Sequence, residues 1–308
     1  MVAVRHRGRW SRIRADWQLY TLILLPLVFF LVFRYLPMLG NIIAFRKFQS
    51  GGSIFGTGPL TLRYFQQFIN QDAFWAVFWN NVIIGLTAFV FTFPLPIILA
   101  LMLNELRSQK FKRVVQTISY LPHFMSVVIV VGIVMELTAA TGIVNQALHA
   151  IVPGASDIML NPNAGRPIYI VSEIWQTTGW GTILYLAALT TIDPQLYEAA
   201  RIDGAGRWRQ TWHVTLPGIR PTMVVLLILN MGAFLAVGFE KLLLLIQGNP
   251  LYMAQADVIS TYVYRVGLAT PSAFSLGAAI GLFESLIGLV LVFSANFFSR
   301  RLVGSSLW

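Results

Sequence analysis

The residue types that carry most enzymatic and metal chemistry are sparse in this sequence and do not cluster. There is no cysteine, which excludes disulfide frameworks, thiolate metal sites and cysteine nucleophiles. Neither a GxSxG elbow nor a GxxxxGK[ST] loop occurs, so the sequence predicts no serine nucleophile of that type and no ATP site of that type. The histidines are spread over different segments without HExxH spacing or a carboxylate cluster, so we expect no zinc site; they are His6, His123, His149 and His213. We therefore expect no enzyme activity, catalytic residue, metal or cofactor in this chain.

The composition predicts that the chain lies in a lipid bilayer. Of its 308 residues, 56% are hydrophobic and 11% are charged, whereas soluble domains average about 25% charged residues. This leaves too little polar surface to cover a water-soluble globule. The net charge of +10 does not indicate a nucleic-acid partner, because the basic residues lie between apolar segments and not on a soluble domain.

Six segments are long and apolar enough to cross a hydrocarbon core of about 30 Å, which takes roughly 20 helical residues. They are residues 19–36, 77–103, 120–140, 167–190, 223–246 and 276–298. We expect the first to stay attached and not to be a cleaved signal peptide, because its apolar run is too long and ends without a small-residue cleavage site. The sequence thus predicts an all-α polytopic membrane protein. Its other parts are a basic N-terminus over residues 1–18, an extracytoplasmic loop over 37–76 and a tail over 299–308.

The distribution of Lys and Arg predicts the orientation of these spans. Fifteen basic residues lie in the N-terminus, the loops after the second and fourth spans, and the tail, against five in the opposite loops. Since cytoplasmic loops collect Lys and Arg, we expect both termini to be cytoplasmic.

The loop between the fourth and fifth spans has the pattern of two short helices. Asp193 can cap a helix that has Pro194 at its first position. Gly204 and Gly206 then allow a sharp reversal of the chain. These residues predict that the first helix ends close to Gly204.

The second predicted helix is amphipathic. Trp208 and Trp212 lie four residues apart on one face, and Pro217 is expected to stop the helix. Charged side chains that a complementary groove could bind are Glu198, Arg201 and Asp203. Two interpretations stay open from these residues alone: a docking element on the cytoplasmic face, or a solvated loop without a partner.

The same loop resembles the EAA loop of ATP-binding-cassette (ABC) importer permeases. Seven residues match its pattern at the family's spacing: Glu198, Ala199, Ala200, Asp203, Gly204, Leu216 and Pro217. Trp212 and Val214 depart from the usual Phe and Ile but keep an apolar face. The resemblance implies that residues 198–217 form a coupling helix that docks into a cleft of a nucleotide-binding ATPase subunit.

A wider resemblance covers nearly the whole chain. Residues 33–48, 93–107, 119–124, 256–268 and 306–308 look like those of polysaccharide-type permeases of the carbohydrate importer class. This implies the type I ABC importer transmembrane-domain fold, with five helices in residues 77–298. It also implies a multi-pass protein of a prokaryotic cell membrane. The implied partners are a second homologous permease, two ATPase subunits that hydrolyse ATP, an extracytoplasmic solute-binding protein and a sugar or oligosaccharide.

A carboxylate in the last span is one candidate for contact with the solute. Gly277, Gly281, Glu284 and Gly288 form one stripe of a helix. Glu284 would cost roughly 2.5 to 3.5 kcal/mol if it faced lipid, so we expect it to face a cavity or a polar partner. A hydroxyl-binding role and a structural hydrogen bond at a helix interface both fit.

Other candidates lie in the fourth and fifth spans and the loop that follows. One face of a continuous fifth helix would carry Asn230, Phe234, Val237 and Lys241, which suits either a sugar or core packing. Tyr262 and Tyr264 take alternate positions of a segment expected to be extended and extracytoplasmic. They could meet the sugar or the binding protein, or be ordinary interfacial aromatics. The same two interpretations apply to the opening of the fourth span, at Glu173, Trp175 and Gln176.

Two alternatives remain for the function. An ion-coupled secondary transporter would also have kinked spans and a buried carboxylate, but would not need an EAA loop. An ABC permease for a solute other than a sugar would share the loop.

Overall fold

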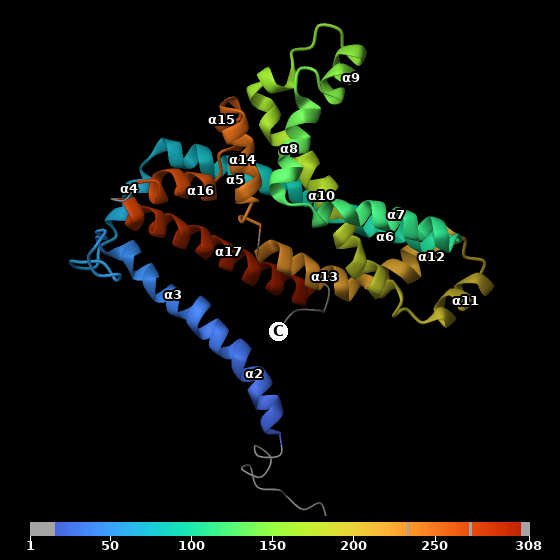
Figure 1. Cartoon of the computed structure of the whole chain (residues 1–308). Coiled ribbons are helices and arrows are strands. Elements are labelled where there is room, and N and C mark those ends of the chain that lie inside the picture. The colour runs from blue at the N-terminus through green and yellow to red at the C-terminus, as the bar shows by residue number, and fades with distance from the viewer. Residues whose placement is uncertain (1–15, 233, 271–272, 303–308) are drawn as a thin grey trace, which may run out of the picture. The chain divides into compact units, whose positions relative to one another are not determined.

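The computed structural model describes residues 16–232, 234–270 and 273–302, and its regular structure over these residues is helical (Figure 1). One isolated bridge, between Lys47 and Thr57, lies outside any strand of this described part. The predicted all-α fold is confirmed. Most of the basic N-terminus and most of the predicted tail lie outside the described residues.

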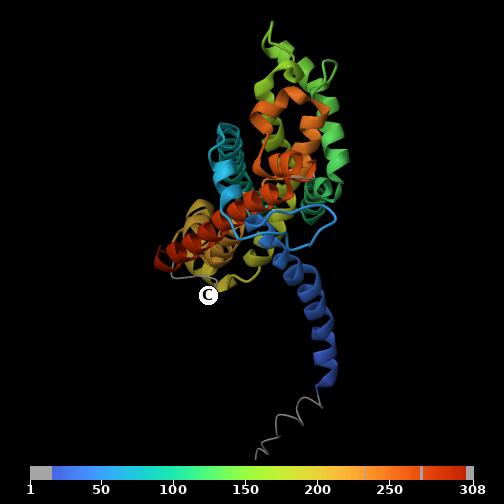
Figure 2. The same cartoon turned by 90° about the vertical axis from the view of Figure 1, so that its left-hand side faces the viewer.

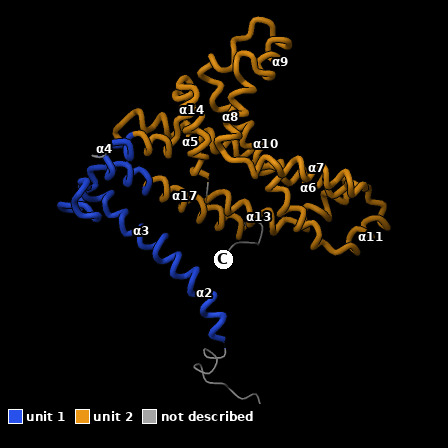
Figure 3. Tube along the Cα trace, viewed as in Figure 1, with its two compact units in different colours: residues 1–68, 266–282 blue, residues 69–265, 283–308 orange. Residues whose placement is uncertain are grey.

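The chain divides into two units, which are coloured separately in Figure 3. The first comprises residues 1–68 and 266–282. Its helices at the start of the chain are α2 (Trp17–Phe30), a π-helical turn (Leu31–Tyr35), α3 (Leu36–Met38), a 3-10 stretch (Leu39–Phe45) and α4 (Arg63–Ile69), which reaches the border of the unit. The helical run therefore contains the predicted first span but extends to Phe45, well into the predicted loop 37–76.

The second unit, residues 69–265 and 283–308, is built around α10 (Gly165–Leu189). Among the described helices, those that pack most extensively against α10 are α5 (Asp72–Thr92), α6 (Pro94–Glu105), α7 (Gln109–Tyr120) and α13 (Leu216–Gly232). The remaining longer helices are α8 (Val127–Thr138), α9 (Ile143–Ile151), α14 (Phe239–Gly248) and α17 (Phe274–Leu302), the last of which runs through both units. In Figure 2 the orange α14 lies beside the green α8, against which it packs.

Within the described residues, five helical runs are long and apolar enough to cross a membrane. They are Trp17–Phe45, Asp72–Glu105, Val127–Ile151, Arg207–Gly232 and Phe274–Arg301. The predicted fourth span corresponds to α10, whose 25 residues reach about 37 Å at 1.5 Å each. This helix is more polar than the others because it carries Ser172, Gln176 and Thr182, all buried in the unit.

The predicted third span begins later than expected. Residues Leu121–Phe124 form a 3-10 turn that contains Pro122, and α8 starts only at Val127. The hydroxyl of Ser126 caps α8 by accepting a hydrogen bond from the Ile129 amide at 3.3 Å. The proline and the cap explain why the helix does not run through from residue 120.

The predicted continuous fifth span, residues 223–246, is wrong. Helix α13 ends at Gly232, and α14 begins at Phe239. Two side chains bind backbone groups between the helices: the Asn81 amide donates to the Leu235 carbonyl at 3.0 Å, and the Tyr169 hydroxyl accepts from the Gly238 amide at 3.0 Å. A break inside an apolar bundle is tolerated because neighbouring helices supply these partners.

A second polar cluster fixes the short helix α15 (Met253–Ala256) to α5 and α10. The Asn80 amide donates to the carbonyls of Ala254 and Asp257 at 3.1 and 3.2 Å. Arg166 donates to the Asn80 side-chain oxygen and, at 2.9 Å, to the Gln255 carbonyl. The segment after α14 is therefore held by side chains of helices far away in the sequence.

The close approach of α5 to the break depends on a glycine. A Cβ added at Gly85 would lie 2.8 Å from the Phe234 carbonyl oxygen, whereas one added at Gly132 in α8 would meet nothing within 4 Å. We expect Gly85→Ala to destabilise the protein by about 1 to 3 kcal/mol relative to Gly132→Ala. Both changes gain the same helix propensity, so their difference isolates the packing. Thermal unfolding in detergent measures it, and equal melting temperatures would contradict the packing account.

Candidate functional site

We call residues 193–217, which lead from the end of α10 into the first turn of α13, the 193–217 segment. It begins with a capped helix. Asp193 accepts a hydrogen bond from the Gln195 amide at 2.9 Å, and Pro194 occupies the first position of α11 (Pro194–Ile202). Proline fits there because the first amides of a helix have no partner within the helix. The predicted start of this helix is confirmed.

The reversal after α11 depends on Gly204. Its φ is +74°, a conformation that other L residues adopt only at a cost. The Ala205 amide donates to the Ala200 carbonyl at 2.8 Å, and the Gly204 amide donates to the Arg201 carbonyl at 3.0 Å. This pair of bonds is a Schellman motif. Gly206 does not share the requirement, because it precedes α12 (Arg207–Gln210) with a φ of −65°.

The expectation that Pro217 stops the second helix is wrong. After α12 the backbone continues as a π-helical turn (Thr211–Thr215) and passes directly into α13. The Thr211 hydroxyl donates to the Arg207 carbonyl at 3.0 Å, and that of Thr215 to the Gln210 carbonyl at 3.3 Å. The π-helical turn before Pro217 is the kind of local adjustment that lets a helix accommodate a proline.

The outer surface of the segment is available for a partner. Ile202 is 87% exposed and Trp208 is 75% exposed. Ala199 is exposed and Ala200 half-buried, so another surface can approach the backbone there. The exposed charged residues Glu198, Arg201 and Asp203 form no ion pair within the described residues.

The inner side of the segment is fixed to the helices. Tyr197, Val214 and Leu216 pack against an apolar cluster whose members come from α6, α10, α13 and the residue just before the segment: Ile97, Ala100, Tyr185, Leu189, Ile192 and Ile219. The hydroxyls of Tyr197 and Thr215 lie 3.1 Å apart in a hydrogen bond. The segment is therefore attached to the bundle on one side and open on the other.

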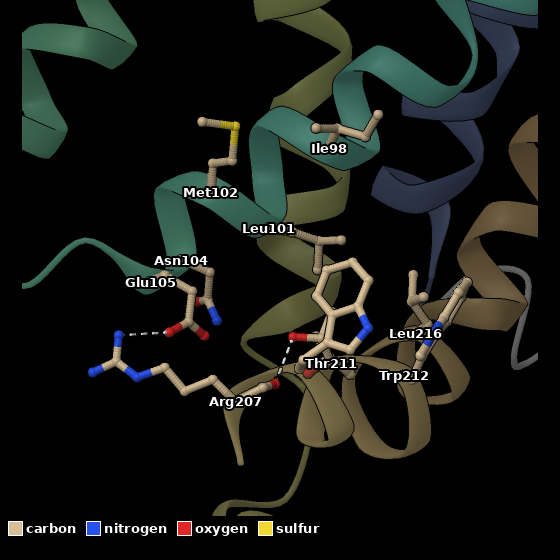
Figure 4. A pocket seen from close by; sticks show the side chains of 11 residues that line it. Ile98, Leu101, Met102, Asn104, Glu105, Arg207, Thr211, Trp212 and Leu216 are labelled. Atoms are coloured by element: carbon tan, nitrogen blue, oxygen red, sulfur yellow. Dashed lines mark hydrogen bonds and ion pairs between the residues drawn. The ribbon is translucent and has the colours of Figure 1, made fainter.

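A groove of about 640 Å³ lies between α6 and the second half of the segment (Figure 4). Its wall on α6 includes Leu101 and Met102, and its other wall includes Trp208 and Trp212. The two indole rings contact edge to face, with centroids 6.2 Å apart, which confirms that they share one side of the helix. At the rim, Arg207 Nη1 lies 3.5 Å from Glu105 Oε2.

Two of the predicted solute-contacting residues meet at the break after α13. Asn230 and Phe234 line a cavity of about 120 Å³ together with Glu173 of α10. Asn230 and Glu173 also line a neighbouring cavity of about 390 Å³, whose wall includes Trp180 and His123. The rings of these last two residues are stacked, with centroids 4.5 Å apart.

Lys241 lies on α14 and not on the helix that carries Asn230, so the predicted stripe along one continuous helix is wrong. Its ammonium lies 2.6 Å from Glu173 Oε2 and 5.7 Å from the centroid of the Tyr169 ring. The lysine side chain is 4% exposed and that of Glu173 is 26% exposed. The break thus brings a buried cation onto the carboxylate of α10.

The other predicted residues lie apart from this site. Glu284 lines a separate cavity of about 700 Å³, with Ser260 among its neighbours. The extended segment expected for Tyr262 and Tyr264 is wrong, because they lie in α16 (Ile259–Tyr262) and a π-helical turn (Val263–Leu268). Tyr262 is 5% exposed and donates to Gln71 at 2.9 Å, whereas Tyr264 is exposed and contacts the ring of Phe239.

Sequence reasoning missed the two asparagines of α5 that hold the later segments in place. Asn80 and Asn81 are buried, and Asn81 also accepts from the Ile259 amide at 3.2 Å. A pair of adjacent amides inside an apolar run is the signal that could have indicated them, because buried polar side chains need partners.

Comparison with known proteins gives a consistent result. Residues 92–304 match the family model described as "Binding-protein-dependent transport system inner membrane component". Protein LplB of Bacillus subtilis is 41% identical, with 94% of this chain and 91% of LplB covered. The polygalacturonan/rhamnogalacturonan transport system permease protein YteP of the same species is 43% identical, with 92% and 88% covered.

A solved structure is similar over almost the entire length of this chain. It is the crystal structure of a bacterial alginate ABC transporter in complex with an alginate pentasaccharide-bound periplasmic protein. One chain of it superposes with a TM-score of 0.87 at 39% identity, with 98% of this chain and 100% of that chain covered.

The turn after α11 provides a test of the geometry. Gly204→Ala places a Cβ at a positive φ, which costs about 1 to 2 kcal/mol, whereas Gly206→Ala does not, and neither Cβ meets an atom within 4 Å. In the Gly204→Ala variant we expect the amides of Gln195 to Ala205 to exchange hydrogen roughly 5- to 30-fold faster. Hydrogen exchange with mass spectrometry on the full chain measures this. Equal rates in the two variants would contradict the strained-turn account.

Proposed function

The chain belongs to the family of binding-protein-dependent transport system inner membrane components, and on that premise we propose that it is a permease subunit of an ABC importer for a sugar or oligosaccharide. Membership of this family makes it a membrane-embedded, multi-pass transport subunit. The observation that carries the proposal is the likeness to the alginate ABC transporter at 39% identity and a TM-score of 0.87.

The partners follow from this assignment. We assign ATP hydrolysis to two separate ATPase subunits and the delivery of solute to an extracytoplasmic binding protein, with a second permease completing the pathway. The alginate transporter was solved with a periplasmic protein that carries a pentasaccharide, which supports the binding-protein role. The excess of Lys and Arg on one side supports cytoplasmic termini and a cytoplasmic 193–217 segment.

The 193–217 segment is suited to transmit motion from the ATPase subunits. Its outer surface offers exposed Ile202, Glu198 and Arg201 to a partner, while Tyr197 and Leu216 pack its inner side onto the bundle. When ATP closes the partner's nucleotide-binding halves, a segment held in this way moves as a rigid body with the start of α13. Because α13 ends at the cavities, that movement reaches the solute path.

We place the solute path at the two cavities around Glu173 and Asn230. An amide, a carboxylate and aromatic rings suit the hydroxyl groups and apolar ring faces of a sugar. Phe234 and Trp180 supply the aromatic part. The cavity at Glu284 is a second place along α17 where a polar solute could be accommodated.

The coupling role predicts loss of transport without loss of the folded bundle. Glu198→Lys reverses an exposed charge on the proposed docking surface. Gly204→Pro cannot reach the φ of +74° and removes the amide that binds the Arg201 carbonyl. In proteoliposomes that contain the full transporter, we expect either change to reduce ATP-dependent uptake at least about 10-fold, the loss that follows from roughly 1.4 kcal/mol of docking free energy.

The control variant is Gly206→Ala, which should transport normally because its backbone is unstrained. Membrane insertion should be unchanged in all three variants. Normal uptake in the Glu198→Lys and Gly204→Pro variants would overturn the coupling role. Uptake that proceeds without ATP or the ATPase subunits would instead favour an ion-coupled transporter.

A further inference from the structure

The two cavities beside the break present one kind of charge. Among the described residues that line them, Glu173 is the only Asp, Glu, Lys or Arg. Lys241 does not line either cavity; it is 4% exposed and lies against the carboxylate of Glu173, with 2.6 Å between Nζ and Oε2. The glutamate therefore faces the cavities, and the lysine supports it from within the protein.

The polar groups around these cavities can exchange hydrogen bonds with a bound molecule. The Asn230 amide nitrogen donates one hydrogen bond to the Leu226 carbonyl at 2.8 Å, which leaves its second N–H as a donor and its oxygen as an acceptor. The Thr177 hydroxyl donates to the Glu173 carbonyl at 2.7 Å, so its remaining capacity is also that of an acceptor. An ionised carboxylate accepts only. Trp180 and Tyr185 add an indole N–H and a hydroxyl that can donate, so the walls offer both acceptors and donors, while their one formal charge is the carboxylate of Glu173.

A lining whose only Asp, Glu, Lys or Arg is a glutamate suits a ligand that brings hydrogen-bond donors and no negative charge. Sugar hydroxyls meet this requirement, because each can donate a hydrogen bond. A uronate places a carboxylate, itself an acceptor, beside Glu173, and like charges at close range in a poorly hydrated site repel. Trp180 provides an exposed aromatic wall for the apolar face of a sugar ring.

We infer that this chain selects neutral saccharide units over uronates through Glu173, and that Lys241 is a positioning residue that holds the Glu173 carboxylate toward the cavities. This inference rests on the proposed function as a sugar permease. The inferred preference for neutral saccharides distinguishes this chain from the similar transporter, which imports the acidic polysaccharide alginate. Lys241 acts through Glu173 and does not meet the solute itself.

The test compares two probes that differ only in charge: galactotriose and trigalacturonate. The full transporter is placed in nanodiscs without its binding protein, so that the permeases alone set the selectivity, and binding is measured by calorimetry. We expect the wild type to bind galactotriose at least about 10-fold more tightly than trigalacturonate, which corresponds to roughly 1.4 kcal/mol.

Three variants resolve the roles of the pair. Glu173→Gln removes the negative charge and leaves the lysine unpaired, so the preference for the neutral probe should fall at least about 10-fold. The double variant Glu173→Gln with Lys241→Met removes both charges, which protects against misfolding from a buried unpaired ammonium; its preference should lie between those of the wild type and Glu173→Gln. Glu240→Gln, an exposed glutamate next to Lys241, is the matched control and should bind as the wild type does.

Equal or tighter binding of trigalacturonate in the wild type would overturn the inference. So would a preference that does not change in Glu173→Gln, or failure of both probes to bind. The proposed function is measured separately, by ATP-dependent uptake driven by the binding protein. If that uptake is present while the selectivity is absent, the inference alone fails.

Discussion

A backbone that leaves its helix inside an apolar bundle must find polar partners within the protein, and this constraint shapes the second unit. Between α13 and α14 the partners are the Asn81 amide and the Tyr169 hydroxyl, brought close by the absence of a side chain at Gly85. The cavities that contain Asn230 and Phe234 lie at this place. The helix break therefore exposes backbone groups that need partners inside the bundle, and the polar cavities lie beside it.

Helix α13 directly connects the proposed docking segment to the proposed solute cavities. It begins at Leu216, where the 193–217 segment packs onto the bundle, and ends at Gly232, where the break starts. Its 17 residues span about 25 Å without another interruption. A continuous helix between an exposed surface and a cavity allows a displacement at one end to reach the other, with no separate relay of side chains.

Local rules predicted the features that local sequence controls. Apolar length located the helices, and the cap at Asp193 and the turn at Gly204 followed from side-chain chemistry and from the conformational freedom of glycine. The break after Gly232 could not be predicted in this way, because its stability depends on Asn81 and Tyr169, which lie far away in the sequence. For the same reason the expected stripe on one helix was not predicted correctly: the break places Lys241 on α14, where it pairs with Glu173 of α10.

The π-helical turn at Thr211–Thr215 has a consequence for the angular setting of the exposed surface. A π turn accommodates one more residue than the α-helical turn it replaces, and each residue of an α-helix advances the direction of its side chains by about 100°. Deleting one residue at this turn would therefore rotate Trp208 and the preceding α11 by about 100° around the axis of α13, without changing the length of α12 or α13. In the proposed coupling role, the extra residue of this turn therefore sets the direction in which α11 and Trp208 face a docked ATPase subunit.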